Sequence, residues 1–130
     1  MLTLMLRTDQ PNAELYLYQS DKLVLSYAWA ADRLLAETIH REIESFLRQA
    51  KTQLSQLEGI GIYSGPGSFT SLRIGHSVAN ALAAGLNLPI VQSNSTSWQE
   101  DVQAMLNDGQ NDRVVLPYYG APVHITTPRK

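Results

Sequence analysis

The residues best suited to chemistry form one run, in which a tight turn leads into a helix. The run SGPGSFTSLRIG occupies residues 64–75 and follows a short apolar segment, 59–63. Glycine tolerates positive φ and proline fixes φ, so a tight turn is expected, and Ser68 can cap the N–H groups of the following helix. Those N–H groups lie at the positive end of the helix dipole, where a phosphate can bind. The candidate anion site therefore consists of Gly65, Pro66, Gly67, Ser68, Phe69, Thr70 and Arg73.

Two interpretations of this turn stay open. In one, Gly65 and Gly67 only reverse the chain, as short glycine-rich turns often do. In the other, the turn holds an anion, although the run lacks the Lys-Ser/Thr pair of a P-loop. Spacing alone does not separate the two interpretations.

Hydrophobic periodicity predicts the elements that must position the turn. We expect strands at 2–6, 14–20, 23–27, 59–63, 89–92, 113–116 and 123–126, and helices at 32–54, 68–86 and 95–107. The apolar face of the expected first helix consists of Leu35, Ile39, Ile43, Phe46, Leu47, Ala50 and Leu54. This order predicts an α/β fold, in which helices pack on a mixed sheet that begins as an antiparallel meander.

Composition bounds the class of protein without indicating a function. With 130 residues, 44% of them hydrophobic, the chain is expected to form one domain with a real core. The net charge is −2 and no Lys/Arg cluster precedes Arg129-Lys130, so we expect no direct contact with nucleic acid. The lack of cysteine excludes disulfides and thiolate metal sites. No apolar run has the length of a membrane span, and the cytoplasm is the expected compartment.

The string GPGSFTSLRIG closely resembles the signature GPGSFTGxRIG of the TsaB (YeaZ) family, the accessory subunit in bacterial threonylcarbamoyl-adenosine tRNA modification. The flanking segments LEGI, residues 57–60, and LNLPIV, residues 86–91, match the family in order. The resemblance covers roughly residues 2–106, and Ser71 replaces the second glycine of the signature.

The resemblance implies a single lobe of the ribonuclease H-like/actin-like ATPase fold. Family members normally carry two such lobes of similar size. Here residues 1–107 resemble the N-terminal lobe, and residues 113–127 resemble the C-terminal end of the family and follow almost directly. The second lobe is then missing or reduced to a remnant, so a function that needs a cleft between two lobes is not carried over.

The helix of the signature carries a stripe of small residues, Ser71, Gly75, Ala79 and Ala83. Such a stripe lets another helix approach closely, either within this chain or from a partner. The resemblance implies a partner, because TsaB proteins pair their first two helices with the catalytic subunit TsaD or with a second copy. The implied interface candidates are Leu35, Ile39, Ile43, Phe46, Leu47, Leu72, His76, Ala79, Asn80 and Ala83.

We expect no catalysis and no metal or cofactor in this chain. Actin-like ATPases place an aspartate at the end of the first strand, where this chain has Arg7, so the expected magnesium ligand is absent. A surface salt bridge of Arg7 is favoured over an anion site shared with Ser68. His40, His76 and His124 show no ligand spacing, and Ser64 and Ser68 show no His/Asp relay.

Three hypotheses follow from these observations. The favoured one is a scaffold that binds a TsaD-type catalytic subunit as a heterodimer and is a homodimer when alone; a TsaE-type ATPase joins that assembly in the family. The second is a small phosphate- or nucleotide-binding protein that uses the turn at 65–70. The third is a homodimeric interaction module that uses the same helix face for another partner.

Overall fold

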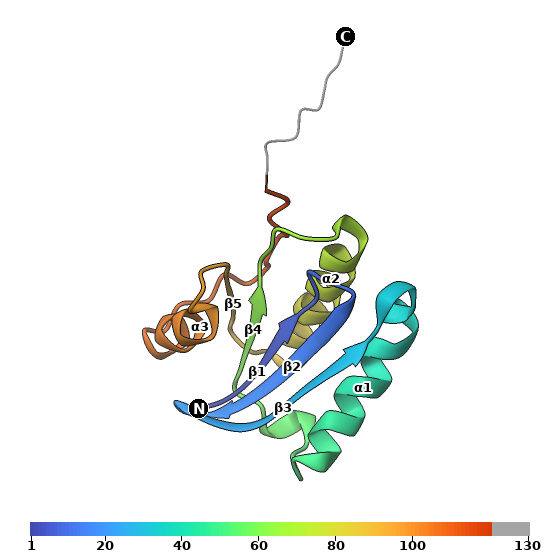
Figure 1. The fold of residues 1–130 in the computed structure, drawn as a ribbon. Helices are drawn as coiled ribbons and strands as arrows, with labels where there is room; N and C mark the ends of the chain where they lie inside the picture. Colours follow the sequence, from blue (N-terminus) through green and yellow to red (C-terminus); the bar gives the residue numbers. More distant parts are fainter. Residues whose placement is uncertain (121–130) are drawn as a thin grey trace.

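Five strands form one mixed sheet in the computed structural model, which describes residues 1–120 (Figure 1). The strand order is β3-β2-β1-β4-β5. Strands β1–β2 and β2–β3 pair antiparallel, whereas β1–β4 and β4–β5 pair parallel. The bounds are β1 Leu2–Arg7, β2 Asn12–Gln19, β3 Lys22–Ala30, β4 Gly59–Tyr63 and β5 Ile90–Ser93. The predicted mixed sheet with an N-terminal meander is therefore confirmed.

Helices cover the sheet on both faces. Helices α1, Leu35–Gln49, and α2, Phe69–Leu86, lie on one face, and α3, Trp98–Asn107, lies on the other (Figure 1). The larger core, between the sheet and the first two helices, includes Leu4, Leu6, Ile39, Phe46, Ile60 and Ile62. The smaller core, under α3, consists of Met5, Val91, Trp98, Val102 and Leu106.

Two glycines let α3 approach strand β4 closely. A Cβ at Gly61 would overlap the side chain of Val102, and one at Gly59 would lie 3.0 Å from a methyl group of Leu106. Ile60 and Ile62, which alternate with these glycines along β4, face the larger core on the other side of the sheet. Because glycine and isoleucine alternate along β4, α3 packs close to the strand on one face of the sheet, whereas isoleucine side chains fill the core on the other face.

The first helix is shorter than its periodicity predicted. It ends at Gln49, and Lys51 takes the left-handed conformation, φ 54°, so the chain leaves the helix axis there. Leu54 belongs instead to a short 3-10 turn, Leu54–Gln56, and is 42% exposed. Its assignment to the buried face of the helix was wrong.

Residues 113–116 do not form the predicted strand. Residues 111–120 cross from the start of β5 to the end of β4, and we call them the C-terminal strap. The backbone N–H of Asp112 donates to the carbonyl of Ile90, and the backbone N–H of Tyr118 donates to the carbonyl of Ser64. Since the side chain of Asn80 bonds the strap backbone at Val115, no neighbouring strand is needed there. The strand expected at 123–126, and much of the expected 113–127 segment, lie outside the described residues.

Candidate functional site

The signature turn lies where β1 and β4 end, side by side at the same edge of the sheet. β1 pairs in parallel with β4, so the loop after Arg7 and the turn after Tyr63 meet. Ser68 donates its backbone N–H to the carbonyl of Asp9 at 3.0 Å. A Cβ at Gly67 would overlap the backbone and Cβ of Asp9. The turn therefore needs glycine at 67 because the loop after β1 lies directly against it.

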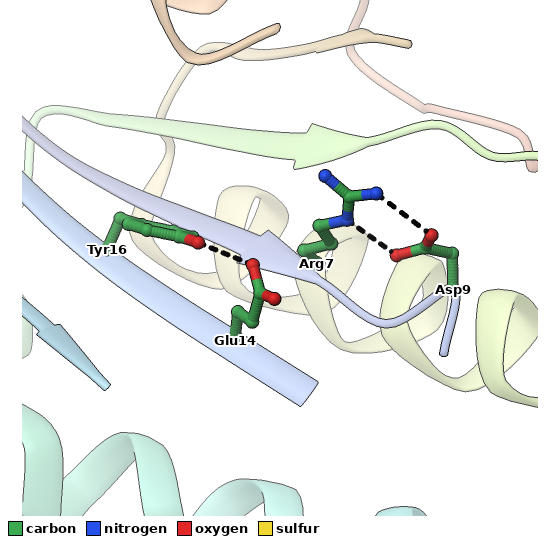
Figure 2. A network of polar contacts seen from close by, with 4 residues as sticks. All are labelled: Arg7, Asp9, Glu14 and Tyr16. Carbon is green, nitrogen blue, oxygen red and sulfur yellow. Dashed lines mark hydrogen bonds and ion pairs between the residues drawn. The ribbon is translucent and has the colours of Figure 1, made fainter. Parts of the chain in front are cut away.

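Arg7 and Asp9 form a bidentate ion pair at this edge. Arg7 Nε lies 2.8 Å from Asp9 Oδ1, and the second contact, from a terminal nitrogen to Oδ2, measures 3.2 Å (Figure 2). The side chain of Asp9 is 5% exposed and that of Arg7 26% exposed, so the predicted salt bridge exists but is largely buried. Burial lowers the pKa of Arg7, but the hydrogen bond and charge of Asp9 outweigh it and raise the pKa above its usual value.

The guanidinium of Arg7 also covers an aromatic ring. Its central carbon lies 3.9 Å from the centre of the Tyr63 ring, within cation–π range. Tyr63 in turn meets Trp98 edge to face, with ring centroids 5.7 Å apart. Arg7, at the end of β1, is therefore held in place by a carboxylate and an aromatic ring.

Glu14, opposite Arg7 in the β1–β2 register, does not join this ion pair. Its carboxylate accepts a short hydrogen bond from the hydroxyl of Tyr16, as Figure 2 shows. Burial and this hydrogen bond raise the pKa of Tyr16. The pairing of Asp9 with Arg7 was not predicted, because nothing in the spacing of the sequence shows that the chain curls back onto Arg7.

Two of the seven candidate anion-site residues, Ser68 and Thr70, line a pocket at the start of α2. The pocket, of about 310 Å³, is lined by Pro11, Asp32, Arg33, Ser68, Thr70, Ser71 and Ile74. Ser68 makes no side-chain capping bond to the helix, so the predicted cap was wrong. Arg33 and the hydroxyls favour an anion, whereas Asp32 opposes one. Of the other predicted residues, Gly65 lies against the carbonyl of Tyr118. The ring of Phe69 stacks on that of Tyr119, and the guanidinium carbon of Arg73 lies 5.5 Å from the centre of the Phe69 ring.

The backbone of the strap is held by Asn80 of α2. The side-chain amide of Asn80 donates to the carbonyl of Val115 at 3.0 Å and accepts its N–H at 2.9 Å. Val115 is 1% exposed, while the neighbouring Leu116 is 70% exposed. Asn80 therefore acts as the partner strand would, which no periodicity could have indicated.

His76 is buried beneath α2 and held from two sides. Its Nδ1 lies 2.8 Å from the carbonyl oxygen of Leu72, and its Nε2 lies 3.1 Å from Oε1 of Gln92. Burial lowers the pKa of His76, against the opposing effect of both hydrogen bonds. Among residues 1–120, no three His, Cys, Asp or Glu side chains come together as metal ligands would.

Comparison with known proteins decides which family carries this arrangement. Residues 29–116 match the family model described as "TsaD: tRNA N6-adenosine threonylcarbamoyltransferase".

The chain belongs to this TsaD/TsaB family.

Three relatives show how far the likeness extends. The chain is 47% identical over 64 residues to tRNA N6-adenosine threonylcarbamoyltransferase of Geotalea daltonii, covering 49% of this chain and 19% of the relative. It is 27% identical over 95 residues to the tRNA threonylcarbamoyladenosine biosynthesis protein TsaB of Haemophilus influenzae, covering 73% and 39%. YeaZ from Pseudomonas aeruginosa superimposes with a TM-score of 0.66 at 27% identity, covering 72% and 44%.

These relatives confirm the TsaB resemblance and the ribonuclease H-like/actin-like ATPase fold. The chain spans less than half the length of each of the three, with shares of 19%, 39% and 44%. The chain matches both TsaD and TsaB relatives, so these comparisons do not separate the TsaD and TsaB branches of the family. Within residues 1–120, no helix has the length and apolarity of a membrane span.

Most of the interface candidates taken from the TsaB family lie in the core of this chain. Nine of the ten are buried: Leu35, Ile39, Ile43, Phe46, Leu47, Leu72, His76, Ala79 and Ala83. The tenth, Asn80, is half-buried and bonds Val115. These side chains can shape a docking surface only from beneath, and a partner outside α1 and α2 would meet other residues.

The small-residue stripe of the signature faces inward. A Cβ at Gly75 would overlap Oγ1 of Thr8, and Ala79 and Ala83 are 0% and 3% exposed. A second set of small residues, unnoticed in the sequence, faces outward on the same helix: Ser77, Ala81, Ala84 and Gly85 are all exposed. Helical spacing from the inward stripe could have revealed it.

Proposed function

We propose that this chain is a non-catalytic partner subunit that binds a TsaD-type catalytic subunit in threonylcarbamoyl transfer to tRNA adenosine. The observation that carries the proposal is the outward face of α2, where Ser77, Ala81, Ala84 and Gly85 are exposed side by side. A helix face without bulky side chains lets a second helix approach closely.

Gly85 supports a partner on this face. A glycine inside a helix costs about 1 kcal/mol relative to alanine. A Cβ at Gly85 would meet nothing within 4 Å, so the packing of residues 1–120 gives no reason for the glycine. A closely packed helix of a partner would give one.

The ion pair at the end of β1 supports a non-catalytic role. The carboxylate of Asp9 is already bound by Arg7 through two contacts, which leaves it poorly suited to hold magnesium. In this proposal the catalytic centre belongs to the TsaD-type subunit, and tRNA binds elsewhere in the complex, in the cytoplasm. A TsaE-type ATPase and a homodimer of the free chain remain parts of the proposal.

The test is to mix the purified chain with a bacterial TsaD-type subunit and to measure the mass of the complex by light scattering after gel filtration. The proposal expects a stable heterodimer at micromolar concentration. Two separate peaks under low-salt conditions would contradict it. A TsaD-type subunit mixed with its own full-length TsaB is the positive control.

A second candidate is a small phosphate- or nucleotide-binding protein. The pocket of about 310 Å³ at the start of α2 favours this role, because Arg33 and three hydroxyls line it. Two observations oppose this role: the carboxylate of Asp32 also lines the pocket, and Asp9 is already paired with Arg7. Calorimetry with ATP and magnesium separates the two candidates. A nucleotide-binding protein should release or absorb heat on binding without any protein partner, whereas a partner subunit should not.

A further inference from the structure

The C-terminal strap runs along one flank of α2, from near the end of the helix back to its beginning. At its start, a backbone hydrogen bond joins the strap to the first residue of β5, which follows α2 after a short turn. In its middle, the side chain of Asn80 bonds the backbone of Val115 twice. Near its end, the ring of Tyr119 stacks on that of Phe69, the first residue of α2, with centroids 4.6 Å apart. The strap is therefore antiparallel to α2 and lies beside it.

The outer side of the strap is apolar. Val115 is buried in the larger core, whereas its neighbours Val114 and Leu116 are 61% and 70% exposed, and Tyr118 is 48% exposed. Side chains of an extended segment alternate between its two sides, so these three lie opposite the side that faces the core. We call Val114, Leu116 and Tyr118 the apolar row. With Phe69 they make up four of the nine large apolar side chains that are exposed within residues 1–120, so exposed apolar surface gathers here.

The outward face of α2 continues the apolar row. With about 100° between successive residues, Phe69 and Asn80 fall within about 20° of each other, on the flank that the strap covers. Ala84 follows about 40° further round the helix, next to Ser77 and Ala81, and all three are exposed. The small side chains let another helix approach α2 closely. A helix seated on them would therefore touch the apolar row as well.

Two arginines flank this surface, and neither forms an ion pair within residues 1–120. Arg73 is exposed near the beginning of α2, and Arg113 is exposed at the start of the strap, toward the end of α2. Helix α2 contains no aspartate or glutamate. The acidic residue of the strap, Asp112, accepts a hydrogen bond from the side-chain amide of Gln110 at 3.0 Å. A complementary partner therefore presents carboxylates near both ends of the surface and apolar side chains between them.

We propose that the strap is part of the surface that binds the TsaD-type subunit, and that its occupant there is an amphipathic helix with carboxylates near both ends of the contact. Burial of the apolar row supplies affinity, and the two arginines fix the direction and register of the helix. This proposal rests on the proposed function, to which it adds a contact from outside α1 and α2.

The experiment is calorimetric titration of a purified TsaD-type subunit with variants of the chain. Val114→Ser combined with Leu116→Ser removes most of the apolar row and should weaken binding at least about tenfold. The matched control is Leu23→Ser, because Leu23 is 49% exposed on β3, at the opposite edge of the sheet, and this variant should bind like wild type. Arg113→Glu should also weaken binding, and its difference from wild type should shrink as salt is added, since exposed charges are screened.

Urea unfolding of each variant shows whether it is folded, as expected for exposed positions. If the double variant does not fold, Arg113→Glu carries the test. A wild-type chain that does not bind overturns the proposed function, and this proposal with it. A wild-type chain that binds, together with a folded double variant or an Arg113→Glu variant of equal affinity, overturns this proposal alone. The same holds if Leu23→Ser weakens binding as much as the double variant does.

Discussion

Thr8 and Gly75 touch where α2 crosses the end of β1. Oγ1 of Thr8 is buried without a hydrogen-bond partner among the described residues, and a Cβ at Gly75 would overlap it. The threonine hydroxyl therefore sits directly against the glycine backbone, and the height of α2 over the sheet depends on position 75 having no side chain.

Gly75→Ala and Gly85→Ala should change stability in opposite directions. The methyl group at 75 collides with Thr8, and overpacking of this kind typically costs about 1–3 kcal/mol. The methyl group at 85 meets nothing and improves helix propensity, which should add roughly 0.5–1 kcal/mol. Urea unfolding of both variants measures this. A destabilising Gly85→Ala, or a neutral Gly75→Ala, would show that α2 is not seated as described.

Breaking the ion pair at the end of β1 should destabilise the chain from either side. Arg7→Met leaves the nearly buried carboxylate of Asp9 without its partner, at a cost of about 1–3 kcal/mol. Asp9→Asn alone should also destabilise, whereas the double variant should cost less than the sum of the two single changes. A double-mutant cycle from urea midpoints measures the coupling. Strictly additive costs would mean that the two groups do not interact in solution.

The free energy of unfolding should depend on pH through the protonation of His76. Burial holds the pKa of the folded state below the ordinary value of 6.5, so the unfolded chain binds the proton first as pH falls. Stability from this group is therefore complete above about pH 6.5 and declines below it, by at most about 1.4 kcal/mol per pH unit for one proton. Urea midpoints between pH 5 and pH 8 test this, and His76→Gln should flatten the decline. An equal decline in the variant would assign the effect to other groups.

Loss of the Asn80 amide should release the strap. Asn80→Ala removes both hydrogen bonds to Val115, so the backbone there should exchange its amide hydrogen faster. Arg113 lies in the same segment and gives trypsin a cleavage site. We expect faster cleavage after Arg113 in Asn80→Ala than in wild type, and no change in Ser77→Ala, an exposed position on the same helix. Equal cleavage rates would show that the strap is held by other contacts.

Much of the fold was predictable because it follows from local pattern. The limits of β4 were predicted correctly, because its short apolar run ends directly at the glycine-rich turn that follows. The antiparallel pairing of β2 with β3 was predictable from the alternating pattern of the two strands, and the chain turns between them at Ser20, which adopts φ 56°. The end of α1 was not predictable in this way, because Ala50 and Leu54 continue the helical period while Lys51 leaves it.

The sequence showed which residues form the signature turn, but not which residues contact that turn. The signature identified the turn, but the partners of that turn, Asp9 and Tyr118, come from segments far away in the chain. The interface candidates on α1 and α2 lie on the apolar faces of these helices, and the structure shows that these faces pack inside the chain. A single sequence shows which positions share a helix face, but not which face another element of the same chain covers.

The central claim is that the outward face of α2 binds a TsaD-type subunit, and one matched pair of variants tests it most directly. Ala81 lies on this face, and Ala104 is an exposed alanine of α3, on the opposite side of the sheet. Calorimetric titration of a TsaD-type subunit should show Ala81→Trp weakening binding by at least about tenfold, or 1.4 kcal/mol, while Ala104→Trp binds like wild type. Equal affinities for all three chains would contradict the account.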